Sequence, residues 1–311
     1  MTEITLVVPT RAAGDHLARA LRSLDEQTLP PDRFEVLVVD DGGPSDAALD
    51  EWHDGGRRRV VRQRRCGMAP ARNLGLFMAQ SPVVLFLADD EVAAPDALEE
   101  HLRAHTTFAD VNAAVVGSSS WSPDLPWTPL LHFLRGIERL PLGYPDEPEE
   151  MTPDFSHFRA RQLSVKRDFL ARYAVFDEAF APLDDVELGC RLRRWGVSLH
   201  HWPAATSTRS TCPTFDEWSE GSVAEGRSIT RLAAAHPGDD IQGHCRVESA
   251  LEHWRRHRSE HAALRAMIRR LEIDIGASID AADPALAREL WLAYRACFDL
   301  DRAAGIAGAR G

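Results

Sequence analysis

The chain has 311 residues, of which 44% are hydrophobic and 27% are charged, and its formal net charge is -12. This composition is typical of a globular protein, and the acidic balance argues against a nucleic-acid binder, because phosphate backbones attract clustered Lys and Arg. No apolar run approaches the roughly 20 residues that span a bilayer, and no signal-like segment begins the chain, so we expect a cytoplasmic protein without a transmembrane segment. The five Cys are scattered without a C-x-x-C pair, which indicates neither a disulfide framework nor a zinc cage.

The first part of the chain alternates short apolar runs with amphipathic helical segments. Residues 4–9 (ITLVVP) and 34–39 (FEVLVV) are typical of buried strands, and the segment between them predicts a helix that Asp15 caps. The pattern continues with a strand at 58–61, a helix at about 69–79, a strand at 83–87, a helix near 97–105 and a strand at 111–117. This alternation predicts an α/β fold with a mostly parallel sheet and helices on both of its faces.

The later part of the chain is less regular. Residues 121–153 are rich in Pro and Trp and predict long loops with a short helix around 130–139. A strand near 161–165, a helix at 186–195 and a strand at 197–202 complete this body, and beyond Pro237 only helical patterns remain, for instance at 247–271 and 284–304. We therefore expect a sheet domain over residues 1–236 and a helical C-terminal region over residues 237–311.

Acidic residues follow two of the expected strands. Asp40 and Asp41 come after FEVLVV, and Asp89, Asp90 and Glu91 come after VVLFL. Ligands of open parallel sheets bind outside the carboxyl ends of the strands. Neighbouring carboxylates are tolerated there when a divalent cation or hydrogen-bond donors offset their charge, but acids that merely end a strand or cap a helix are the alternative.

A third acidic stretch begins the helix expected at residue 186. Asp184 and Asp185 stand at its N-terminus, where the helix dipole favours anions. A carboxylate in this position could act as a base, and an ordinary helix cap is the alternative.

Several blocks over roughly residues 3–230 together resemble family 2 glycosyltransferases of the GT-A fold. They are, in the order of that family, VVPT, LxxALxSLxxQ, FEVLVVDDGG, GMAPARNLG, LFLADDE, SVKRDFL, FDEAF and DDVELGCRLRRWG. The resemblance implies a Rossmann-like nucleotide-diphospho-sugar transferase domain with a helical appendage. The residues that it assigns to the donor nucleotide are Pro9, Thr10, Arg11, Asp40, Arg72, Asn73 and Asp89. For Asn73, helix capping and packing are an equal interpretation.

The resemblance also implies a metal and a base. LFLADDE is similar to the D-x-D motif of the family, with Ala88 in place of its first Asp. It implies Mg²⁺ or Mn²⁺ on Asp90, with Glu91 as a substitute ligand, bridging the two donor phosphates. In DDVELG the second acid, Asp185, corresponds to the general base, and Asp184 is the second choice. The implied reaction transfers a sugar to an acceptor nucleophile by in-line displacement with inversion, and UDP is the preferred nucleotide of the donor.

One feature departs from the family, whose members commonly place a His after the strand that follows this helix. Residues 200–214 have Ser, Thr or Arg at the expected position. Arg209 is a candidate to bind phosphate instead, because a guanidinium forks onto two oxygens. Trp121 and Trp127 resemble the acceptor side of the cleft, and packing of a long loop explains them at least as well.

Two functions from different classes stay open. The first is an inverting glycosyltransferase whose acceptor is a natural product, a glycan or a lipid-linked sugar. The second is a GT-A-fold nucleotide-binding or scaffold protein without turnover, which Ala88 and the missing His favour. A pyrophosphorylase or a nicotinamide-dependent dehydrogenase lacks support, because the glycine-rich loops of those enzymes are absent. The C-terminal helices could cover the acceptor cleft, pack against the sheet domain or form a homodimer.

Overall fold

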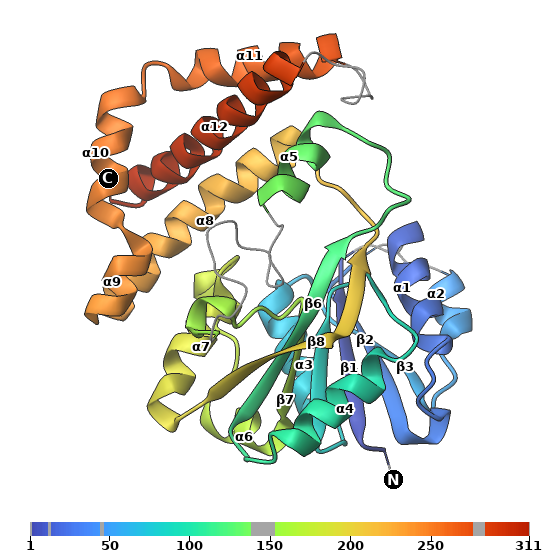
Figure 1. Ribbon diagram of the computed structural model, residues 1–311. Helices are drawn as coiled ribbons and strands as arrows, with labels where there is room; N and C mark the ends of the chain where they lie inside the picture. Colours follow the sequence, from blue (N-terminus) through green and yellow to red (C-terminus); the bar gives the residue numbers. More distant parts are fainter. Residues whose placement is uncertain (1, 12–13, 44–46, 138–152, 276–283, 311) are drawn as a thin grey trace. The chain divides into compact units, whose positions relative to one another are not determined.

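The computed structural model describes residues 2–11, 14–43, 47–137, 153–275 and 284–310, which belong to two compact units (Figure 1). The first unit contains residues 1–123, 140–178 and 184–211, and the second contains residues 124–139, 179–183 and 212–311. This division differs from the boundary expected after residue 236, because the long helix α8 (Phe215–Ala235) belongs to the second unit.

The first unit is built on an eight-stranded sheet with the strand order β3-β2-β1-β4-β7-β6-β8-β5. The strands are β1 (Ile4–Thr10), β2 (Phe34–Asp40), β3 (Arg58–Arg62), β4 (Val83–Leu87), β5 (Glu91–Ala93), β6 (Ala113–Trp121), β7 (Gln162–Lys166) and β8 (Ser198–Arg209). Strands β1 to β4 are parallel neighbours, β7 is antiparallel to β4 and β6, and β5 is antiparallel to β8. The predicted α/β class is confirmed, with a mixed sheet.

Helices cover both faces of this sheet (Figure 1). They are α1 (Asp15–Asp25), α2 (Ala47–Trp52), α3 (Met68–Met78), α4 (Ala97–Thr107), α6 (Arg167–Tyr173) and α7 (Asp184–Leu192), with short 3₁₀ turns at Pro31–Arg33, Phe155–His157 and Arg193–Trp195. Val7 of β1 packs in one core with α3, α6 and α7, while Leu6 and Val8 pack in a second core with α1 and α4. Since successive side chains of a strand point to opposite faces, a strand covered on both sides is apolar throughout.

Local details differ from the sequence-based expectations. Gly14 is the N-cap of α1, so Asp15 is the first helical residue instead of the cap. Strand β8 extends to Arg209, beyond the expected end at residue 202, because it pairs with β6 on both sides of an irregularity between Val116 and Ser118. The second half of β8 thereby reaches the edge of the sheet where the acids lie.

Two buried histidines of α4 face β7. The hydroxyl of Ser164 lies 2.9 Å from Nδ1 of His101 and 2.8 Å from Nε2 of His105. Burial lowers the pKa of each imidazole to about 3. Both rings are therefore neutral at pH 7, and α4 is held to the sheet by uncharged hydrogen bonds.

The second unit is helical throughout its described residues. Its helices are α5 (Pro129–Ile137), α8, α9 (Asp239–Cys245), α10 (Val247–His257), α11 (His261–Ile275) and α12 (Pro284–Arg310). A 3₁₀ turn at Glu178–Phe180 lies where the chain passes from the first unit into the second. A Cβ on Gly226 of α8 would lie 2.0 Å from the carbonyl oxygen of Arg302 in α12. Glycine there lets the two backbones touch. The helix expected over residues 247–271 is divided by a turn at residues 258–260.

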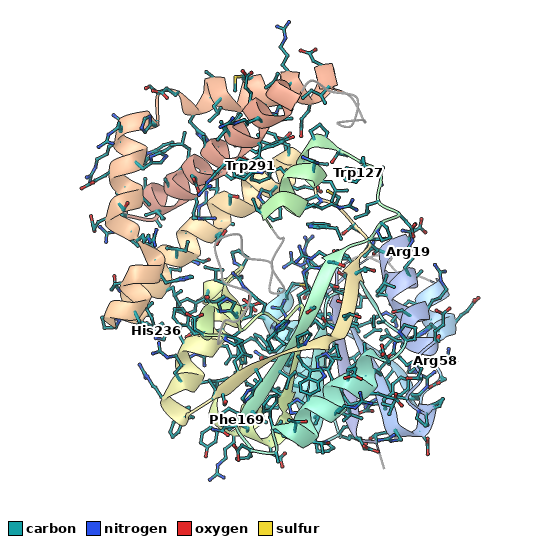
Figure 2. The ribbon with its side chains drawn as sticks, in the orientation of Figure 1. Arg19, Arg58, Trp127, Phe169, His236 and Trp291 are labelled. Atoms are coloured by element: carbon teal, nitrogen blue, oxygen red, sulfur yellow. The ribbon has the colours of Figure 1, made fainter. Side chains whose placement is uncertain are left out.

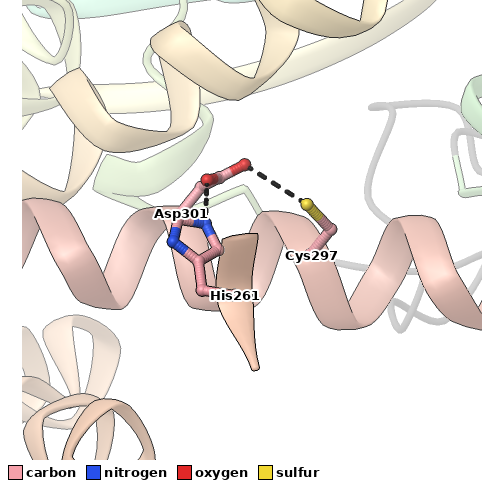
Figure 3. A group of neighbouring side chains, drawn as sticks. All are labelled: His261, Cys297 and Asp301. Carbon is pink, nitrogen blue, oxygen red and sulfur yellow. Dashed lines mark hydrogen bonds and ion pairs between the residues drawn. The ribbon is translucent and has the colours of Figure 1, made fainter. Parts of the chain in front are cut away.

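Asp301 of α12 is a fully buried acid that lies beside His261 and Cys297 (Figure 3). Its carboxylate accepts a hydrogen bond from the Ser219 hydroxyl, and it lies 2.6 Å from Nε2 of His261 and 3.5 Å from Arg265. The Cys297 thiol donates to the same carboxylate at 3.7 Å. One charged group thus joins α8, α11 and α12. Among the helices that the structure describes, none has the length and apolar character of a membrane span.

Candidate functional site

The carboxyl ends of β1, β2 and β4 bring the predicted nucleotide-binding residues together. Thr10 lies opposite Asp40 in the parallel pairing of β1 and β2, and its hydroxyl donates a 2.7 Å hydrogen bond to Asp89. Asp40 is mostly buried and accepts a 2.8 Å hydrogen bond from the N–H of Gly43, which closes the turn after β2. Pro9 is buried within β1, whereas Arg11 follows the strand with half of its side chain exposed.

Asp41 is a buried acid for which the sequence predicted no role. It accepts hydrogen bonds from the Gln63 amide at 2.8 Å, from the N–H of Cys66 at 2.7 Å and from the N–H of Gly67 at 2.9 Å. Burial by itself raises the pKa of Asp41, but these donors and the Arg11 charge outweigh it and hold the pKa below its ordinary value. Asp41 therefore fixes the loop between β3 and α3, and its position directly after Asp40 is the only sequence signal for it.

Asp90 is held by two side chains that are distant from it in sequence, Arg161 and Thr211. It accepts a 2.6 Å hydrogen bond from Arg161 and a 2.8 Å hydrogen bond from the Thr211 hydroxyl. Burial raises the pKa of Asp90, and the Arg161 charge with these hydrogen bonds outweighs it, so the pKa lies below its ordinary value. Neither Arg161 nor Thr211 was singled out in the sequence, because both come from segments far from Asp90 along the chain.

Glu91 is fully buried in β5, in contrast to the two acids before it. Its carboxylate accepts hydrogen bonds from the hydroxyls of Ser119 and Ser207 and, at 3.1 Å, from Arg161. The Nε of Arg209 lies 3.8 Å away. Because its oxygens are enclosed by protein donors, Glu91 offers no open position to a metal ion.

Arg209 and Trp121 form a stacked pair at the ends of β8 and β6. The two residues lie opposite each other in the pairing of these strands, and the guanidinium carbon is 4.7 Å from the centre of the Trp121 ring. Trp121 is 9% exposed, so its ring supports Arg209 and presents little surface of its own. Trp127 belongs to the helical unit, where it is exposed and contacts Arg135 (Figure 2).

The acids at the start of α7 have different partners. Asp184 forms an ion pair with Arg72 of α3 at 2.5 Å. Asp185 accepts hydrogen bonds from the N–H of Ala160 at 2.9 Å and from the N–H of Val186 at 2.8 Å. Burial, and then the charge of Asp185, raise the pKa of Asp184, although Arg72 opposes this shift. Asp184 is thus a buried, paired acid, whereas two backbone donors orient Asp185.

Arg72 and Asn73 contact the protein in this structure. The Asn73 amide donates to the carbonyl of Phe176 at 2.8 Å and accepts from the N–H of the same residue at 2.9 Å. This reciprocal pair favours the packing interpretation of Asn73. Arg72 lies over the Phe176 ring and joins α3 to α7 through Asp184.

The segment that leads into β7 connects the second and third acidic stretches, and Thr10, which lies opposite Asp40, connects the first stretch to the second. Ala160 donates to Asp185, and its neighbour Arg161 contacts Asp90. On the other side Asp89 is bonded to Thr10, at the end of β1. Residues that are about 175 positions apart in sequence therefore line one edge of the sheet in the first unit.

The mixed sheet, the helices on both faces and the acids at the strand ends have the architecture of the GT-A fold. The model of Glycosyl transferase family 2 matches residues 5–171, and the chain belongs to this family. Validoxylamine A glucosyltransferase of Streptomyces hygroscopicus subsp. limoneus is 29% identical over 228 residues, which cover 63% of this chain and 49% of that protein. The succinoglycan biosynthesis protein ExoU of Rhizobium meliloti is 33% identical over 105 residues, 32% of this chain and 30% of that protein. The chain therefore spans about half the length, or less, of these relatives.

Two solved structures share the fold. The mannosyltransferase PcManGT from Pyrobaculum calidifontis, in complex with GDP-Man and Mn²⁺, matches with a TM-score of 0.60 at 18% identity, over 98% of this chain and 86% of that chain. TarS of S. aureus matches with a TM-score of 0.52 at 14% identity, over 75% of this chain and 42% of that chain. At such low identity the likeness concerns the fold alone.

Proposed function

We propose that the chain is an inverting glycosyltransferase that moves a sugar from a nucleoside diphosphate sugar to an acceptor nucleophile. UDP is the nucleotide that we favour. The observation that carries the proposal is the connection of Asp89, Asp90 and Asp185 through Thr10 and the segment Ala160–Arg161. Family membership supports it. Among the acceptor classes, the name of the relative validoxylamine A glucosyltransferase favours a natural product.

The nucleoside would bind at the ends of β1 and β2. In this proposal Pro9, Thr10, Arg11 and Asp40 hold the base, and Asp89 faces the ribose. Asp89 keeps 25% of its side chain exposed, so its carboxylate is open to a sugar hydroxyl. A hydroxyl or imide N–H that donates to a carboxylate forms a strong, charge-assisted hydrogen bond.

A divalent ion fits Asp90 better than Glu91. The Asp90 side chain is 15% exposed, whereas Glu91 is 0% exposed and enclosed by donors. Proteins commonly bind Mg²⁺ through one or two carboxylates together with substrate phosphates, so a single acid beside a diphosphate is a sufficient protein contribution. We therefore assign Asp90 as the residue that would hold Mg²⁺ or Mn²⁺. A bound ion would neutralise the charge of the leaving diphosphate.

Asp185 takes the proton from the acceptor. Its two backbone hydrogen bonds fix the carboxylate plane, and the remaining lone pairs can accept the proton of a nucleophile. Attack on the anomeric carbon from the face opposite the diphosphate inverts its configuration. Asp184 is less suited to this role because Arg72 holds it.

The test joins binding to turnover. Calorimetric titration of the chain with UDP and GDP, with and without Mn²⁺, identifies the nucleotide, and mass spectrometry of donor and acceptor mixtures measures transfer. We expect Asp90→Asn and Asp185→Asn to abolish transfer, while Asp168→Asn on the exposed surface of α6 leaves it unchanged. Normal turnover of both site variants would reject the assignment. Nucleotide binding without any transfer by the unaltered chain would favour the scaffold function. The cytoplasmic location and the homodimer stay predictions.

A further inference from the structure

Arg161 is a charged side chain at the centre of the acids, yet the family motifs give it no role. It lies between Asp90 and Glu91, and its Nη1 donates to both, at 2.6 Å and 3.1 Å. Its side chain is 38% exposed. The backbone supports this position, because the carbonyl of Arg161 accepts a hydrogen bond from the N–H of Ala88 at the end of β4.

The rest of the guanidinium is open. Within the part of the chain that the structure describes, Nη1 is the nitrogen of Arg161 that has acceptors. The other two nitrogens, Nη2 and Nε, are not fully buried. An arginine has five N–H donors in a planar fork. The acids thus hold one corner of the group, and its other donors have no acceptor among the described residues.

A second arginine lies near the same carboxylate oxygen, Oε1 of Glu91. Nε of Arg209 lies 3.8 Å from the Glu91 carboxylate and 3.3 Å from the Ser119 hydroxyl, and Trp121 supports the face of the guanidinium. Glu91 is therefore a buried anion between two cations. A fully buried carboxylate is costly unless such partners offset its charge, so it fixes both side chains in place.

We propose that Arg161 binds the diphosphate of the donor and that Glu91 is the positioning residue that aims Arg161, together with Arg209, at the phosphate oxygens. This inference rests on the proposed function, because it concerns the same donor site. The chemistry is specific: a guanidinium held at one corner can fork onto two phosphate oxygens with its remaining N–H groups. These two guanidinium groups would add positive charge beside Asp89 and Asp90, where a diphosphate is otherwise repelled by the neighbouring carboxylates.

Calorimetric titration with uridine, UMP and UDP separates this role from general damage to the site. In buffer without divalent metal, the unaltered chain should bind UDP more tightly than uridine. Arg161→Met should weaken UDP binding roughly 10- to 100-fold, the value of one or two charge-assisted hydrogen bonds, and leave uridine binding within about twofold. Arg161→Lys should recover only part of the loss, because a point charge cannot fork. If GDP is the nucleotide, the same series uses guanosine, GMP and GDP.

Arg103→Met is the matched control, since this exposed arginine pairs with Glu100 on α4. It should change neither affinity. Glu91→Gln removes the buried charge at constant shape. It should lower the affinity for UDP and leave the affinity for uridine the same. Thermal unfolding checks that this variant is folded. An equal loss for uridine and UDP would reduce Glu91 to a structural role and reject its part of the proposal.

The outcomes distinguish the two proposals. If the unaltered chain prefers UDP to uridine and Arg161→Met retains that preference, the role of Arg161 is rejected and the glycosyltransferase proposal stands. If the unaltered chain binds no nucleoside or nucleotide at all, both proposals fail.

Discussion

The Asp185 carboxylate accepts a hydrogen bond from the backbone N–H of Ala160, 2.9 Å away, and the next residue along the chain, Arg161, contacts Asp90. One short segment before β7 therefore supports both an acid at the start of α7 and an acid after β4. Since a backbone donor is independent of side-chain substitution, the geometry at Asp185 can persist when its charge is removed. This makes the role of Asp185 testable without loss of the fold.

Asp185→Asn should lower the rate of transfer by roughly 100- to 10,000-fold, which is the usual contribution of a general base. The single amide oxygen can accept from Ala160 but not from Val186 as well, so we expect a loss of about 1 kcal/mol in the free energy of unfolding, while nucleotide affinity should remain close to that of the unaltered chain. Steady-state transfer assays and calorimetry measure the two properties separately. A loss of nucleotide binding equal to the loss of rate would contradict the assignment of Asp185 as the base.

The Arg72–Asp184 ion pair should contribute to stability more than a surface pair does. The two side chains are 16% and 5% exposed, so removal of one partner leaves a buried charge without its counter-ion. We expect Arg72→Met to lower the free energy of unfolding by roughly 3 kcal/mol. Because burial and then the Asp185 charge already raise the pKa of Asp184 against the effect of Arg72, the variant should raise that pKa further.

A double-mutant cycle checks this interpretation. Urea unfolding of Arg72→Met, Asp184→Asn and the double variant should show that the double variant is less destabilised than the sum of the single variants. Additive losses would mean that the two side chains do not interact.

The sequence predicted those features that depend on local pattern. Buried strands such as β1 and β2 were visible as apolar runs, and the acids at their ends follow from where parallel strands stop. The reason for Gly75, in contrast, becomes visible only in the structure: a Cβ there would lie 2.2 Å from a side-chain carbon of Val7, so the glycine lets α3 pack closely on β1.

Features that depend on antiparallel register were not visible in the sequence. Arg161 reaches Asp90 because β7 runs antiparallel to β4, and Arg209 reaches Glu91 because β5 and β8 pair over three residues. No local periodicity encodes such pairing. The environment of Glu91 was missed for the same reason, since its hydroxyl donors come from β6 and β8.

The buried histidines of α4 predict a loss of stability in mild acid. Burial lowers the pKa of His101 and His105 to about 3, whereas an imidazole in the unfolded chain titrates near its ordinary value of 6.5. The unfolded state thus binds protons first as the pH falls, so the stabilisation is complete above pH 6.5 and decreases below it. The loss approaches about 1.4 kcal/mol per pH unit for each group only below pH 6.5, so between pH 7.5 and 5.5 it amounts to about 1.4 kcal/mol for each group, or roughly 3 kcal/mol for the pair.

Urea unfolding at pH 7.5 and pH 5.5 measures this effect. The variant His101→Gln/His105→Gln should lose about 3 kcal/mol less than the unaltered chain between these two pH values. Other groups titrate equally in both proteins, so they cancel in the comparison. Equal losses would show that these two imidazoles do not govern the acid sensitivity.

Asp301 should be the most sensitive single polar position of the helical unit. Its carboxylate is fully buried and contacts His261 of α11 and Cys297 of its own helix (Figure 3). It also contacts Ser219 of α8 and Arg265 of α11. Asp301→Asn keeps the shape but removes the negative charge, so the partly buried Arg265 loses its buried partner and keeps Asp216, which is more than half exposed. We expect a loss of roughly 3 kcal/mol in the free energy of unfolding. Ser219→Ala removes one neutral donor and should cost about 1 kcal/mol.

The control for this pair is Asp299→Asn, an exposed acid on the same helix, which should change stability by less than about 0.5 kcal/mol. Thermal and urea unfolding, followed by circular dichroism, measure all three variants. Asp301→Asn should lower the free energy of unfolding more than Ser219→Ala does, because it removes the charge that all of the donors share, whereas Ser219→Ala removes one neutral donor. If Asp301→Asn is no more harmful than Ser219→Ala, the charge of Asp301 does not hold α8, α11 and α12 together, and apolar packing such as the Gly226 crossing is sufficient.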